Sequence, residues 1–201
     1  RPFYHVVKRL FDIVASACGL ILLSPLFLFL VIKIRSEDGG PAFYSQERIG
    51  KNEKPFKMWK FRSMIVDADK MLDKLEDQNE IDGAMFKIKD DPRVTKIGHV
   101  IRKYSLDELP QLWNVLIGDM SLVGPRPPLP SEVEEYTNYD KQRLTVVPGC
   151  TGLWQVTKRN EADFDEMVWL DIVYINHSGA WEDLKLIIKT VLVMVHPNGA
   201  Y

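Results

Sequence analysis

The longest apolar run of the chain lies close to its start. Residues Ile13–Ile32 form twenty consecutive positions without a charged side chain. A helix of that length covers about 30 Å, the thickness of the hydrocarbon core of a bilayer. A signal peptide would have a shorter apolar core followed by small residues, and a buried core helix would be shorter and carry a polar stripe. The run therefore predicts a helix that enters a membrane.

The flanks and the middle of this run bear on how the helix enters. Basic residues stand at both ends, namely Lys8, Arg9, Lys33 and Arg35. A spanning helix is basic mainly at its cytoplasmic end. Ser24-Pro25 lies just past the middle, where the proline kinks a helix and the serine hydroxyl can bind a freed carbonyl. These features leave two equal alternatives: a kinked span, and a re-entrant hairpin that leaves on the side it entered.

Beyond Ser36 the apolar positions follow shorter periods. Pro41–Gly50 predicts a strand or an extended turn. Pro55–Met64 alternates apolar and basic residues, which predicts a half-buried strand that presents Lys57, Lys60 and Arg62. Asp67–Asn79 has helical spacing within an acidic stretch, which we interpret as a solvated helical face.

Two later segments have wide apolar arcs with aromatic residues at their ends. Phe164–Ile175 and Trp181–Val195 are too short to span a bilayer but have the length of amphipathic helices. An interfacial position and a position in the protein core are equally compatible with them. The whole pattern predicts an α+β, mostly helical fold, with a membrane-entering helix over residues 1–36, either a kinked span or a re-entrant hairpin, and a small cytoplasmic globular domain over 37–201.

Composition narrows the classes of function. Of the 201 residues, 46% are hydrophobic and 27% charged, which excludes a disordered chain. The formal net charge of −2 gives no basic field for nucleic acid. Two cysteines, Cys18 and Cys150, are too few for a disulfide framework or a thiolate metal site, and reduced thiols fit a cytosolic face.

The densest chemical signal is the stretch Arg102–Asn114. Ser105 followed by Glu108 is a capping-box pattern, so a helix is expected to begin there with Asp107 and Glu108 in its first turn. Two acids at a helix start are usually only good caps. The basic residues of other segments change that interpretation, because several cations together with glycine turns can bind an oligophosphate. These cations are Lys60, Arg62, Arg102, Arg126 and Arg159.

An acidic pair among phosphate-binding cations has two plausible tasks. One acid can hold Mg²⁺, which binds carboxylates together with substrate phosphates. The other can be a nucleophile toward phosphorus, as aspartate is in enzymes that form an aspartyl phosphate. The histidines lack metal-ligand spacing, and no complete phosphate-loop or dinucleotide motif is present.

Several motifs together resemble the bacterial sugar transferase family, the monotopic polyprenyl-phosphate phosphoglycosyl transferases. They are KRLFD at 8–12, SP at 24–25, FKMWKFRSM at 56–64, RKYSLDELPQLWNVLIGDMSLVGPRP at 102–127 and VPGCTGLWQV at 147–156. The resemblance implies transfer of a sugar 1-phosphate from a UDP-sugar to undecaprenyl phosphate, with release of UMP. It also implies Mg²⁺, an Asp-Glu dyad and a membrane helix that re-enters at Ser24-Pro25.

The resemblance assigns roles to individual residues. Asp107 is the expected nucleophile, and Glu108 its assistant, with both acids as the expected metal ligands. Phosphate binding is expected of Lys60, Arg62, Arg102, Arg126 and Arg159, and Asp171 is a further pocket candidate. Thr157-Lys158 departs from the asparagine-glycine pair common at this point of the family.

The resemblance also implies a setting. The enzyme is expected at the cytoplasmic face of the inner membrane, in the first membrane step of capsule or exopolysaccharide assembly. Glucose or galactose is the expected sugar, and a homo-oligomer is left open. Because the chain begins with Arg1, we expect it to be part of a longer protein with additional N-terminal transmembrane segments. A membrane-anchored phosphatase and a nonenzymatic scaffold are the alternatives.

Overall fold

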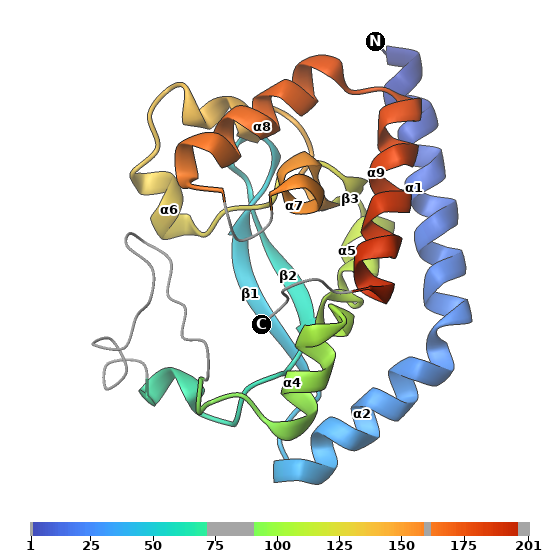
Figure 1. Cartoon of the computed structure of the whole chain (residues 1–201), viewed down its shortest axis with the longest axis vertical. Helices are drawn as coiled ribbons and strands as arrows, with labels where there is room; N and C mark the ends of the chain where they lie inside the picture. The colour runs from blue at the N-terminus through green and yellow to red at the C-terminus, as the bar shows by residue number, and fades with distance from the viewer. Residues whose placement is uncertain (1, 72–90, 159–161, 197–201) are drawn as a thin grey trace.

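A computed structural model describes residues 2–71, 91–158 and 162–196 (Figure 1). Along one side run two helices, α1 (Pro2–Leu22) and α2 (Ser24–Asp38), whose axes are bent by 59° at the break between them. The predicted helix is therefore confirmed, and it extends beyond the apolar run at both ends. Within the described ranges no single helix is long and apolar enough to cross a membrane, whereas this bent pair has the required length and composition.

The bend has a local cause in the sequence. Pro25 has no N–H to give to the carbonyl of Ile21, four residues earlier. The hydroxyl of Ser24 donates to that carbonyl instead, over 2.7 Å. The expectation that Ser24 binds a carbonyl freed by the proline is confirmed.

The two predicted strands form an antiparallel hairpin. Strand β1 (Phe43–Ile49) pairs with β2 (Pro55–Phe61), with Phe43 opposite Phe61, around the short turn η1 (Lys51–Glu53). The hairpin ends in an apolar cluster in which Phe61 packs with Leu30 and Ile34 of α2. The second arm of the bent pair is thus part of the core of the globular region.

The remaining elements build the body of the molecule around this hairpin (Figure 1). In chain order they are η2 (Ala68–Met71), α4 (Lys96–Lys103), η4 (Leu106–Glu108), α5 (Gln111–Ile117), β3 (Ser121–Val123), α6 (Pro130–Glu134), η5 (Asp140–Thr145), β4 (Gly149–Thr151), α7 (Leu153–Thr157), α8 (Phe164–His177) and α9 (Ala180–Val195). The fold is α+β and mostly helical, as predicted. The helix expected over Asp67–Asn79 is described only as the short η2, and the rest of it lies outside the described residues.

The first arm, α1, is fixed to the body by polar side chains. Arg9 donates to the carbonyls of Val115 and Leu116 at the end of α5, over 2.6 and 2.8 Å. Asp12 is buried and accepts from the amide of Leu122 in β3. The KRLFD motif therefore connects α1 to two elements of the globular region.

Helices α8 and α9 are present where the sequence predicts them. The start of α9 is tied to α1, because Asp183 accepts from Lys8 over 2.7 Å and from Tyr174 of α8 over 2.6 Å. Both α9 and α1 leave large apolar side chains exposed. On α9 these are Trp181, Leu184, Ile188, Val191, Leu192 and Val195, and on α1 they include Phe3, Val6, Leu10 and Val14.

Strands β3 and β4 are parallel and bring two glycine-containing motifs together. The amide of Gly124 donates to Thr151, and the amide of Gly149 donates to Pro125. A Cβ atom at Gly149 would collide with the backbone of Gly124. Glycine is required here because two backbones touch.

This contact gives a test of the fold. We expect Gly149→Ala to lower the free energy of unfolding by about 1–3 kcal/mol, the usual cost of overpacking, because backbone atoms cannot move away as a flexible side chain can. Gly179→Ala is the matched control, since a Cβ there has open space. Chemical denaturation of both variants measures the difference, and equal stabilities would show that the two motifs are not packed so closely.

Candidate active site

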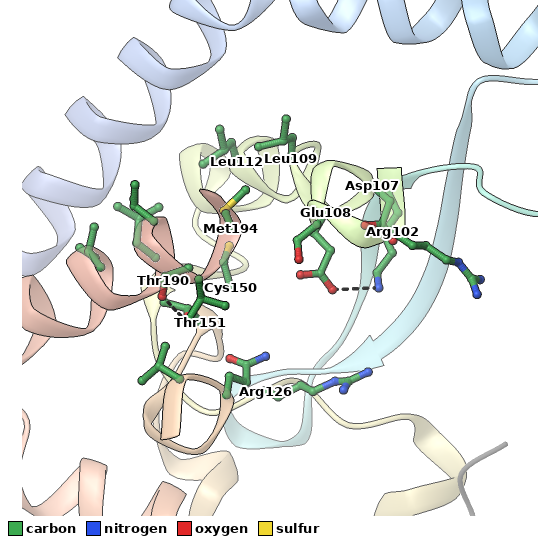
Figure 2. Close-up of a pocket in the computed structure, with 18 of the residues that line it drawn as sticks. Arg102, Asp107, Glu108, Leu109, Leu112, Arg126, Cys150, Thr151, Thr190 and Met194 are labelled. Atoms are coloured by element: carbon green, nitrogen blue, oxygen red, sulfur yellow. Dashed lines mark hydrogen bonds and ion pairs between the residues drawn. The ribbon is translucent and has the colours of Figure 1, made fainter. Parts of the chain in front are cut away.

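A pocket of about 590 Å³ lies beside the acidic turn, between the hairpin and the end of α9. Its charged wall carries Lys60, Arg102, Asp107, Glu108 and Arg126, and Figure 2 shows Glu108 and Arg126 facing the same space. These residues come from β2, α4, η4 and the loop after β3. Five of the residues predicted for a phosphate site are thus brought together.

The acidic turn does not have the predicted form. Ser105 adopts a left-handed conformation with φ 55°, and its side chain makes no capping hydrogen bond. An N-cap residue normally has extended backbone, so the capping box expected from Ser105 and Glu108 is wrong. The acids instead lie on the single turn η4, and the α-helix α5 begins only at Gln111. Their carboxylates are therefore free to face the pocket.

The two acids have different surroundings. Glu108 is half-exposed and forms an ion pair with Lys60, with 3.4 Å between Oε1 of Glu108 and Nζ of Lys60. Burial raises the pKa of Asp107 to about 6, and the charge of Glu108 acts in the same direction, while Lys60 and Arg102 oppose the shift. Perturbed carboxyl groups of this kind gather at functional sites.

Arg102 is placed by a close contact between α4 and the end of the hairpin. Gly98 lies against the carbonyl of Ser63, where a Cβ would collide with it. One turn later the Nε of Arg102 donates to the hydroxyl of Ser63 over 2.9 Å. The glycine therefore sets the depth at which Arg102 lines the pocket.

The opposite wall is apolar and was not predicted as part of the site. It is formed by α7, by β4 and by the last turns of α9. Leu109, directly after η4, and Leu112 of α5 also contribute (Figure 2). From α9 it receives Ile187, Thr190, Val191, Val193 and Met194. The helical periodicity of α9 predicts an apolar face, but it does not indicate that this face lines the pocket. Cys150 also lines this wall, and burial raises the pKa of its thiol, so it is not a competing thiolate.

Two predicted site residues have other partners. Arg62 makes a bidentate ion pair with Asp38 at the end of α2, at 2.6 and 2.7 Å, and does not line the pocket. Asp171 is fully buried and accepts from Arg143 over 2.6 Å, also away from the pocket. Arg159 lies outside the described residues.

The metal expected at the site meets an incomplete set of protein ligands. No group of three His, Cys, Asp or Glu side chains that could hold a metal ion occurs in residues 2–71, 91–158 and 162–196. Mg²⁺ is usually held by one or two carboxylates together with substrate phosphates and water. Asp107 and Glu108 in a pocket that also holds cations for phosphate supply that donor set. The residues therefore fit Mg²⁺ bound jointly with a phosphorylated substrate.

Comparison with known sequences shows the family to which the chain belongs. The sequence model of the family described as "Bacterial sugar transferase" matches residues 3–197, so the chain belongs to this family. It is 50% identical over 196 residues to galactosyl transferase CpsE of Streptococcus agalactiae, covering 97% of this chain and 43% of that protein. It is 46% identical over 199 residues to undecaprenyl-phosphate galactose phosphotransferase of Salmonella typhimurium, covering 97% and 42%.

The length of the relatives varies. The chain spans less than half of the two galactose-named relatives. It spans 91% of the exopolysaccharide production protein ExoY of Rhizobium meliloti, to which it is 40% identical over 205 residues. The described pocket therefore lies in the part shared by long and short members.

The raised pKa of Asp107 predicts a pH-dependent stability. Between an ordinary carboxyl pKa of 3.8 and about 6, the folded state binds more protons than the unfolded state, so stability falls as pH rises through this window. Asp107→Asn removes that cost. We expect the free energy of unfolding of this variant to rise by about 1–2 kcal/mol relative to the wild type between about pH 4 and pH 7. Thermal unfolding across this range measures the gain.

Asp38→Asn is the control, because its expected change in stability has the opposite sign. The hydrogen bonds from Arg62 lower the pKa of Asp38 to about 2, so its contribution to stability is lost only as pH falls. This variant is expected to lose stability against the wild type at neutral pH. A gain for Asp107→Asn that does not depend on pH would contradict the burial of an ionised Asp107.

Proposed function

We propose that this chain is a phosphoglycosyl transferase that moves a hexose 1-phosphate from a UDP-hexose to undecaprenyl phosphate and releases UMP. The observation that carries the proposal is the half-buried Asp107 among Lys60, Arg102 and Arg126 in one pocket. The names of the relatives support the two substrates and a role in capsule or exopolysaccharide assembly. Glucose and galactose are the sugars to test first.

The first step is a displacement at the β-phosphorus of the UDP-sugar. An oxygen of the Asp107 carboxylate forms a bond to this phosphorus, and the bond to the bridging oxygen breaks, so that UMP leaves with that oxygen. The sugar 1-phosphate is then held on Asp107 as an acyl phosphate. Lys60, Arg102 and Arg126 offset the charge on the phosphoryl oxygens, and Glu108 assists beside Lys60.

The second step returns the enzyme to its starting state. An oxygen of undecaprenyl phosphate attacks the phosphorus of the intermediate, the bond to Asp107 breaks, and the carboxylate is regenerated. The same cations serve both substrates in turn because each presents a phosphate at the same point. This order predicts ping-pong kinetics.

Asp107 and Glu108 are the residues that would hold Mg²⁺, together with the substrate phosphates. When bound, Mg²⁺ supplies charge stabilisation at the phosphoryl oxygens. The Glu108 side chain is 44% exposed, and among the described residues its ion-pair contact is with Lys60 through Oε1, so oxygen capacity is left for a cation. Removal of divalent cations is expected to stop UMP release.

The exposed apolar helices support a membrane position for the site. The bent pair of α1 and α2, basic at both ends, supports a re-entrant hairpin on the cytoplasmic face of the inner membrane. The exposed apolar residues of α9 fit a place in the interface plane. The apolar pocket wall on α9 would then lie at the height of the lipid headgroups, where the lipid substrate presents its phosphate.

Asp107→Asn tests the nucleophile. The change keeps the size of the side chain, so we expect a folded protein whose transfer rate falls by about three orders of magnitude or more. Wild-type protein given UDP-galactose or UDP-glucose without lipid is expected to release UMP as a burst of one equivalent. It should also gain the mass of a hexose phosphate in a hydroxylamine-labile adduct, and mass spectrometry of both proteins detects the difference.

Asp165→Asn is the matched control, since Asp165 lies in the first turn of α8 away from the pocket. Labelled undecaprenyl phosphate then separates the alternatives by product. Lipid-linked sugar supports the transferase, free sugar phosphate indicates a phosphatase, and no product indicates a scaffold. Release of UMP only after addition of lipid, without any adduct, would show direct attack and exclude the role of Asp107.

Cysteine labelling tests the topology. Phe3→Cys and Ser36→Cys, each in a Cys18→Ser background, place thiols at exposed positions near the two ends of the bent pair. A re-entrant hairpin keeps both on the cytoplasmic side, so neither is expected to react with an impermeant maleimide in intact cells. Both should react after permeabilisation, and labelling of one end alone from outside would show a span.

Pro25→Ala extends the same test to the cause of the bend. The alanine restores a backbone donor for the carbonyl of Ile21, so the two helices can join into a straighter one. We expect part of the population to become labelled from outside at one end. An unchanged pattern would mean that packing of α2, and not the proline, decides the topology.

A further inference from the structure

The segment Gly124–Pro128 carries Arg126 into the pocket, yet it has few means of holding itself in place. Three of its five residues are prolines, which lack a backbone N–H. Such a segment cannot form a regular hydrogen-bonded structure of its own. Its conformation therefore depends on donors from other elements that reach its carbonyl groups.

Each carbonyl from Pro125 to Pro128 accepts such a donor. The outer two are bound by backbone amides, and the inner two by arginine side chains. The donors are Gly149 N to Pro125 at 2.8 Å, Arg143 Nη2 to Arg126 at 3.3 Å, Arg48 Nη1 to Pro127 at 3.0 Å and Ile49 N to Pro128 at 2.9 Å. The carbonyl of Arg126 and the carbonyl of the next residue, Pro127, are thus each held by a guanidinium group.

Both arginines are buried, and neither lines the pocket. Arg48 is 6% and Arg143 3% exposed. Arg143 is fixed in turn by Asp171 at 2.6 Å and by the hydroxyl of Tyr136 at 2.8 Å. Buried guanidinium groups with several fixed partners hold a loop more rigidly than exposed ones, because little solvent competes for their donors. Asp171 therefore fixes the side chain of Arg143.

Arg48 differs from Arg143 in the balance of charge. Its hydrogen bonds go to neutral oxygens, the carbonyl of Pro127 and Oε1 of Gln46. Burial lowers the pKa of Arg48 to about 10, and the charge of Arg126 acts in the same direction, while the charges of Glu132 and Glu108 oppose the shift. A buried cation beside a second cation is costly unless anions are close. A substrate phosphate bound by Arg126 would add negative charge beside these two carboxylates.

We propose that Arg48 and Arg143 are positioning residues that hold Arg126 in its phosphate-binding position through the main-chain carbonyls of Arg126 and Pro127, with Asp171 fixing Arg143. The proposal rests on the proposed function, because it takes Arg126 as a ligand of substrate phosphate. Sequence reasoning expected Asp171 to contact the substrate. Here it acts two contacts away from the pocket.

A double-mutant cycle with Arg126→Ala tests this route. The readout is kcat/KM for UMP release from the UDP-hexose that the protein uses. We expect Arg48→Met to lower it on the order of tenfold in the wild-type background and to have almost no further effect in the Arg126→Ala background. The pair Arg143→Met with Asp171→Asn, which avoids leaving a buried carboxylate unpaired, is expected to behave in the same way.

Arg62→Met is the matched control, because Arg62 is also buried and also donates to backbone carbonyls, but far from this segment. Any loss it causes should persist in full in the Arg126→Ala background. A loss for Arg48→Met that likewise persists would overturn the proposal, because it would show a general structural role.

Amide hydrogen exchange gives a readout independent of activity. In Arg48→Met, peptides that contain residues 124–132 are expected to exchange faster, while the exchange of α5 and the melting temperature stay close to those of the wild type. Unchanged exchange in this segment would overturn the positioning role even if transfer is confirmed. If instead Arg126→Ala alone leaves UMP release intact, the phosphate-binding role of Arg126 in the proposed function fails, and the positioning of Arg126 for phosphate fails with it.

Discussion

Pro25 has no backbone N–H, and the arrangement of this molecule depends on that constraint. It divides one long apolar helix into two arms, and each arm holds a different part of the body. The polar side of α1 binds the end of α5 and β3 through Arg9 and Asp12. The second arm packs Leu30 and Ile34 against Phe61 and Ile101, next to α4. The acidic turn η4 lies between α4 and α5. The two arms therefore contact the two helices that flank the acids, α1 with α5 and α2 with α4.

A second constraint is charge in a partly dry pocket. Asp107 is buried enough to raise its pKa, yet Lys60 and Arg102 are near enough to favour its ionised form. A carboxylate balanced in this way is costly for the fold and useful for attack on phosphorus, since its charge is not neutralised by a tight ion pair. Glu108 takes the nearer contact with Lys60. The two adjacent acids therefore differ in exposure and in their contact with Lys60.

The site is assembled from segments that have little regular structure. The acids lie on a single turn, and Arg126 lies in a proline-rich loop. Rigidity comes instead from contacts around these segments: glycines that let backbones meet at 98, 124 and 149, and buried guanidinium groups that bind loop carbonyls. The apolar wall of α9 completes the pocket, which places apolar side chains opposite charged ones.

The sequence by itself determined most of the elements and the family of the chain. The break at Ser24-Pro25, both hairpin strands and helices α8 and α9 follow from local periodicity and from proline, which act over a few residues. The gathering of Asp107, Glu108, Lys60, Arg102 and Arg126 was predictable because these residue types share one chemical use. Tertiary structure decided the rest. A capping box depends on the backbone of Ser105, which turned out left-handed, and the partners of Arg62 and Asp171 are residues distant in sequence. A charged side chain pairs with whatever opposite charge the fold brings near it, and that proximity is not encoded in local spacing.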